Sequence, residues 1–169
     1  RSLKIRKELL EQSENPVALR ECKQGIAQSL SNIGTIYNNH GDPNCAPHKS
    51  AECIKAGIAK ALDYFVRSLK IREEIGDKQV IARSLNNIGI GYLQISFVPK
   101  ALMSKQKNLL LALSYCDKSL ALSKKLGYPE NIRNAEQILS KIDSVRGNYA
   151  GAYEHYKQYI IYSDSIANE

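Results

Sequence analysis

The chain has 169 residues, of which 43% are hydrophobic, and this is enough for one domain with a continuous core. Its formal net charge is +7, but its 24 lysines and arginines are interleaved with 17 acidic residues, which is typical of solvated helix faces and argues against a nucleic-acid partner. No apolar run is long enough to span a membrane, so we expect no membrane span either.

The first predicted element is a helix over residues 1–12, which opens with the hexapeptide RSLKIR. The same hexapeptide recurs at Arg67–Arg72, within a later helix that has a partner. Residues 1–12 therefore resemble the second helix of a pair without its first, and we expect the chain to be a fragment of a longer protein. Its exposed apolar face predicts self-association at high concentration. That face consists of Leu3, Ile5, Leu9 and Leu10.

Two later helices carry the pattern around which the chain is organised. A helix predicted over residues 17–39, after a turn ending at Pro16, contains SLSNIGTIY, and a helix over 79–95 contains SLNNIGIGY. In each, Leu, Ile and Tyr recur three to four residues apart and line one face. A glycine, Gly34 or Gly89, interrupts each helix. Because glycine costs ~1 kcal/mol there relative to alanine, its recurrence indicates a neighbouring helix that comes close.

Each of these helices is followed by one of a second kind. The segment Ala61–Gly76 (ALDYFVRSLKIREEIG) matches Ala112–Gly127 (ALSYCDKSLALSKKLG). We predict helices from residue 50 to 75, with Gly76 as its C-terminal cap, and from 100 to 126.

The last two helices, predicted over 130–146 and 149–167, follow the pattern less closely. Glu136 and Asp143 stand where Leu and Tyr are expected. The core of this pair should therefore come from Ile138, Leu139 and Ile142.

This alternation of two helix types resembles the tetratricopeptide repeat, in which a small residue on the first helix and an alanine on the second allow close packing. The small residues are Gly34, Gly89 and Ser140, and the alanines are Ala61, Ala112 and Ala152. The resemblance implies an all-α fold, an α-solenoid of antiparallel helix pairs that forms a superhelix with lengthened helices. It implies a single array over residues 1–169, made of pair one (17–76, with an inserted turn at 41–50), pair two (79–127) and pair three (130–167).

By the same resemblance, the chain is a non-catalytic module that binds a protein or peptide, as part of a larger bacterial regulatory protein. Alternatively, it transmits a signal to an attached kinase, cyclase or DNA-binding module. The compartment stays open between the cytoplasm and, for a membrane sensor, the periplasm. First helices line the concave side in this family, which gives six candidate peptide-binding residues. They are Asn32, Arg83, Asn86, Asn87, Asn134 and Lys141. The recurring Asn32 and Asn87 could instead form hydrogen bonds between neighbouring helices.

Four residues around the inserted turn are the strongest candidates for a metal site. His40, Cys45, His48 and Cys53 could bind zinc, although their spacing matches none of the common zinc patterns. The simpler interpretation is a polar loop that holds these residues without a metal, and a Cys45–Cys53 disulfide is a third alternative, open in an oxidising compartment. We expect neither a cofactor nor a catalytic residue; His155, on a helix beside Glu154, is more typical of a packed or surface histidine than of a general base.

Overall fold

The computed structural model describes residues 3–6, 8, 15–42, 44–45, 50–99 and 103–168. This part of the chain contains helices and no strand, so the predicted all-α class is confirmed. None of its helices combines the length and the hydropathy that crossing a membrane requires. The chain divides into two compact units, residues 1–84 and 85–169, which we describe separately.

Unit 1 contains α2 (Pro16–His40) and α3 (Ala51–Ile75). The Asn15 side chain caps the start of α2 by accepting a hydrogen bond from the Val17 N–H at 2.9 Å. Ser50 caps α3 in the same way, and α3 ends as predicted at Gly76, whose φ of 79° is left-handed. These caps explain why the two helix boundaries agree with the sequence pattern to within about two residues.

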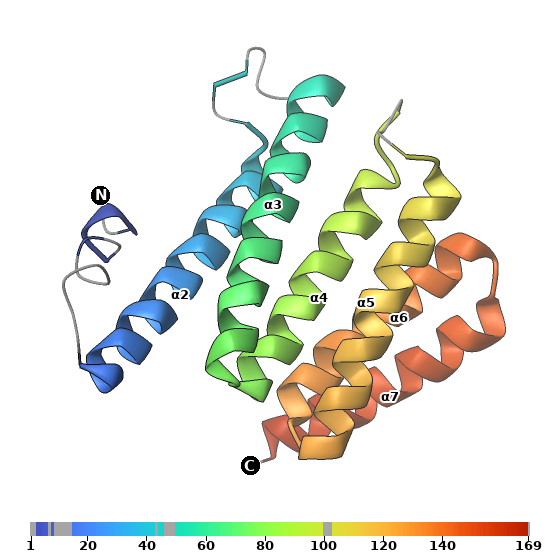
Figure 1. Cartoon of the computed structure of the whole chain (residues 1–169). Helices are drawn as coiled ribbons and strands as arrows, with labels where there is room; N and C mark the ends of the chain where they lie inside the picture. The colour runs from blue at the N-terminus through green and yellow to red at the C-terminus, as the bar shows by residue number, and fades with distance from the viewer. Residues whose placement is uncertain are drawn as a thin grey trace. The chain divides into compact units, whose positions relative to one another are not determined.

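The helices α2 and α3 form the expected antiparallel pair (Figure 1). Gly34 lies where they come closest. A Cβ atom on Gly34 would lie 2.7 Å from the Phe65 ring and 3.2 Å from the carbonyl oxygen of Ala61. Further along the pair, the rings of Tyr37 and Tyr64 stack with their centroids 5.7 Å apart. The sequence prediction that Gly34 faces Ala61 is therefore confirmed.

The helix α4 (Lys78–Ile95) begins in unit 1 and continues into unit 2 from residue 85. Unit 2 also contains α5 (Lys105–Leu126), α6 (Pro129–Arg146) and α7 (Tyr149–Ala167). Left-handed glycines end two of these helices, Gly127 after α5 and Gly147 after α6. The short connections that follow them allow each helix to turn back along its neighbour.

The start of α5 differs from the prediction. We predicted a helix from residue 100, but α5 begins at Lys105. Ser104 has extended backbone geometry, and its hydroxyl accepts a hydrogen bond from the Lys107 N–H at 3.3 Å. This N-cap sets the helix start. Residues 100–102 lie outside the described residues.

The core of unit 2 forms between α4, α5 and α6. Ile138, Leu139 and Ile142 are buried there, as predicted, together with Leu93, Leu109, Ala112 and Cys116. The close approach seen in unit 1 recurs, because a Cβ atom on Gly89 would clash with the Sγ atom of Cys116 and lie 3.3 Å from the Ala112 carbonyl oxygen. The rings of Tyr92 and Tyr115 also stack, 5.7 Å apart.

Candidate functional site

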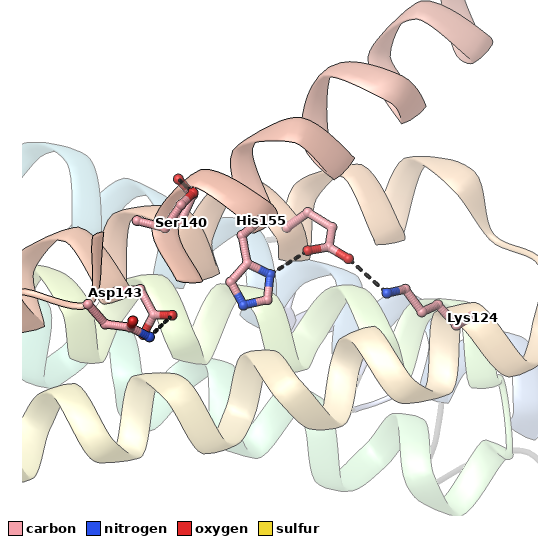
Figure 2. Close-up of polar contacts among 7 residues, drawn as sticks. Lys124, Ser140, Asp143 and His155 are labelled. Carbon is pink, nitrogen blue, oxygen red and sulfur yellow. Dashed lines mark hydrogen bonds and ion pairs between the residues drawn. The ribbon is translucent and has the colours of Figure 1, made fainter. Parts of the chain in front are cut away.

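Several polar contacts surround the third helix pair, α6 and α7 (Figure 2). The sequence prediction aligned Ser140 with Gly89, and the Ser140 hydroxyl donates a hydrogen bond to the carbonyl oxygen of Ala152 at 2.8 Å. The expected small-residue contact is thus kept, with a hydrogen bond added. Asp143, at the position of Tyr92, accepts from the Asn148 amide at 2.9 Å.

Glu136 is the most buried charge of this pair, with 1% of its surface exposed. One of its carboxylate oxygens lies 2.9 Å from the Lys124 ammonium, and the other lies 2.6 Å from Nδ1 of His155 (Figure 2). Both carboxylate oxygens are therefore paired, which burial of a charge requires. The contact fixes the His155 ring between α6 and α7. His155 is a packed histidine, as the sequence indicated, but its partner is Glu136 rather than a helix neighbour.

Unit 1 has a polar junction that the sequence analysis missed, although both of its arginines end an RSLKIR segment. Arg72 donates to the Ser84 hydroxyl at 2.6 Å, and Arg6 donates to the Ser29 hydroxyl at 2.7 Å. Each serine opens one of the two SLxNIG patterns. Twenty-two residues separate Arg6 from Ser29 and 11 separate Arg72 from Ser84, yet the same contact forms in both places. The repeated sequence segments therefore give rise to the same arginine–serine hydrogen bond in both places.

Arg72 is nearly inaccessible to solvent, with 3% of its surface exposed. Its guanidinium also donates to the Gln28 amide oxygen at 3.0 Å and to the Val80 carbonyl oxygen at 3.4 Å. The Gln28 amide nitrogen in turn donates to Asn32 at 2.7 Å. Burial, helped by the nearby Arg83 cation, lowers the pKa of Arg72 to about 10, so the group remains charged at neutral pH. Asn32, a predicted binding residue, is thereby connected to a buried cation.

The six predicted binding residues divide between the units, Asn32 and Arg83 in unit 1 and the other four in unit 2. Asn32, Arg83 and Lys141 are exposed, and Asn87 and Asn134 are half-buried. The Asn134 amide oxygen accepts from the neighbouring Arg133.

Asn86 differs from the expectation, because it is buried, with 3% of its surface exposed. Its amide nitrogen donates to the carbonyl oxygen of Asn131 on α6 at 3.3 Å. The prediction placed Asn86 on a free face of α4, but α6 covers that face. Asn86 therefore connects two helices and is not available to a ligand.

A disulfide joins Cys45 of the inserted turn to Cys53 near the start of α3, with the two Cα atoms 5.5 Å apart. This is the alternative to zinc, because a disulfide uses both thiols that the metal would need. Within the described residues no cluster of three metal ligands occurs, and His48 lies outside them. The Lys60 ammonium contacts Asp42 at 2.7 Å beside the turn, and this hydrogen bond holds the pKa of Asp42 below its usual value.

Comparison with known proteins adds no family to this description: no protein-family model matches the chain, and no curated protein matches it at a significant level.

Proposed function

We propose that the chain is a non-catalytic module of a bacterial regulatory protein, in which tetratricopeptide-like helix pairs form an α-solenoid that binds a protein or peptide. The observation that supports this proposal best is the recurrence of one close approach in all three pairs. Gly34 faces Ala61, Gly89 faces Ala112, and the Ser140 hydroxyl bonds to the Ala152 carbonyl. A contact repeated at one position of each pair is what a helical repeat requires.

The polar side chains favour binding over catalysis. In the third pair, the Ser140 hydroxyl donates to a backbone carbonyl, and the Glu136 carboxylate is buried between two cationic or imidazole groups. These contacts stabilise helix packing. By contrast, Asn32 on α2 and Lys141 on α6 are exposed on the first helix of a pair. An amide and an ammonium at such positions suit the backbone and the acidic groups of a peptide.

The test is capture of the partner from the source cell, followed by titration of the recovered partner against variants of the chain. Asn32→Ala reports on unit 1 and Lys141→Ala on unit 2. Each replaces an exposed side chain and should change the free energy of unfolding by less than about 0.5 kcal/mol. We expect at least one of them to weaken binding tenfold, roughly 1.4 kcal/mol.

Lys70→Ala on α3 and Lys125→Ala on α5 are matched controls, because both lysines are exposed on second helices. The controls should bind as the parent does. If all four variants bind the partner with the parent's affinity, the first helices do not form the binding surface, and the proposal is wrong.

A further inference from the structure

Unit 1 contains a pocket of about 400 Å³ beside the Arg6 and Arg72 junctions. This volume lies in the lower part of the range of roughly 300–1,000 Å³ that small-molecule sites occupy. Its charged and amide lining groups come from α2, α3, the residue before α4 and the helical residues 3–6. They are Arg6, Glu21, Gln24, Gln28, Arg72 and Asp77.

The buried guanidinium of Arg72 is the feature of this pocket that favours binding of an anion. Its hydrogen bonds go to the Ser84 hydroxyl, the Gln28 amide and the Val80 carbonyl, all of them neutral. Among the described residues, no carboxylate forms a direct ion pair with it; the Asp77 carboxylate attracts it from a greater distance, and the nearby Arg83 cation repels it. A buried charge without a directly paired counter-ion is costly, so an anion in contact with the guanidinium would stabilise this arrangement.

Arg6 brings a further cation to the same pocket. Its guanidinium donates to the carbonyl oxygen of Gly25 and to Ser29. Gly25 leaves space for the Arg6 side chain, because a Cβ atom at residue 25 would lie 3.0 Å from Nε of Arg6. The two arginines therefore line the pocket from different helices.

We propose that this pocket binds a carboxylate group, with Arg72 at its base and Arg6 at its side. A guanidinium can donate two parallel hydrogen bonds to a carboxylate or to a phosphate. The acidic residues of the pocket select between the two. Glu21 and Asp77 also line it, and their negative charges oppose a phosphate dianion more strongly than a carboxylate monoanion.

The remaining groups suit a carboxylate that belongs to an amino acid or to a peptide end. Gln24 can exchange hydrogen bonds with an amide next to the carboxylate. Glu21 can accept from an ammonium or an N–H group. Asp77 is less available, because its side chain accepts from the Val80 N–H at 3.3 Å at the start of α4.

The experiment titrates the whole chain with acetate, N-acetylglycine, glycine and inorganic phosphate at constant ionic strength set with chloride. The readout is the backbone amide shift of Gly25 and the side-chain Nε–H shifts of Arg6 and Arg72 in NMR spectra. We expect saturable shifts with the carboxylates and tighter binding of acetate than of phosphate. If N-acetylglycine binds more tightly than glycine, the site is specific for peptide ends. If glycine binds more tightly, the site is specific for free amino acids.

Two variants test the residues. Arg72→Lys keeps the positive charge but loses the planar guanidinium that donates two parallel hydrogen bonds. Arg6→Gln changes the less buried arginine, so it can still test the proposal if the Arg72→Lys protein unfolds. Each should raise the Kd for acetate at least tenfold, while Lys70→Ala leaves it unchanged. Absence of saturable shifts, tighter phosphate binding, or an Arg6→Gln protein with the parent's Kd would overturn the proposal. Since no cellular partner is used, these outcomes are independent of the partner titration above.

Discussion

Gly89 on α4 packs directly against Cys116 on α5, so closely that a Cβ atom on Gly89 would overlap the cysteine Sγ. Cys116 is fully buried at this contact, and burial raises the pKa of its thiol to about 12. The thiol therefore stays protonated at neutral pH and behaves as a small apolar side chain. This contact is where the sequence pattern placed a neighbouring helix.

The contact predicts that Gly89→Leu overpacks the α4/α5 interface. We expect a loss of about 1–3 kcal/mol in the free energy of unfolding, measured by urea denaturation. The loss should exceed the gain of roughly 0.8–1 kcal/mol that replacing a helical glycine brings.

A double-mutant cycle separates the clash from other effects of the substitution. Gly89→Ala should be less destabilising in a Cys116→Ala background, because the Sγ atom that it meets is absent. Coupling of about 0.5 kcal/mol or more is expected. Additive effects of the two changes would show that Gly89 and Cys116 are not in contact.

The sequence predicted the helices and their pairing because both depend on local, repeated signals. Helical spacing, the caps at Ser50 and Gly76, and the recurring Gly34 and Gly89 all act within a helix or across one pair. The predictions that were wrong concern residues that contact a third helix, outside their own pair. Asn86 was assigned to a free face, but α6 covers it through Asn131.

The Arg72 junction was missed for a related reason. Its partners Gln28 and Ser84 come from two different helices, and nothing in the local pattern indicates which of many polar side chains turns inward. The available signal was the second copy of the hexapeptide, since its arginine recurs at Arg6 with the same kind of serine partner. The repeated hexapeptide is visible in the sequence, but the arginine–serine hydrogen bond that both copies form is visible only in the structure.

Glu136 offers a second prediction, because the sequence prediction expected a leucine at its position. Glu136→Ala leaves a cavity at a nearly inaccessible position and removes the partner of Lys124 and His155, and should cost about 2–5 kcal/mol, mainly through the cavity. Glu136→Leu fills the space, and the two partners, both partly exposed, can turn to water. We expect this variant to lie within about 1 kcal/mol of the parent.

Urea denaturation of the two variants, with the exposed Glu73→Ala as a control, measures the difference. The control should change stability by less than about 0.5 kcal/mol. Equal losses for Glu136→Ala and Glu136→Leu would mean that the ion pairs, rather than the filled volume, hold α6 against its neighbours.

The inserted turn yields the last prediction, which separates the disulfide from zinc. With Cys45 and Cys53 joined and Cys22 and Cys116 free, the denatured, unreduced protein should show two reactive thiols, and the reduced protein four. A zinc site would instead give four thiols without reduction, together with about one equivalent of metal.

Breaking the disulfide should also lower stability. On the chain-entropy argument, a loop of this size contributes about 2–3 kcal/mol, so a reductant or Cys45→Ser should lower the melting temperature. Cys22→Ser is the matched control, because it removes a free, half-buried cysteine and leaves the turn closed. If Cys45→Ser has the same melting temperature as Cys22→Ser, the disulfide does not stabilise unit 1. In that case the Lys60–Asp42 ion pair and the hydrogen bond from the Asp42 N–H to the Cys53 carbonyl oxygen would hold the inserted turn against α3.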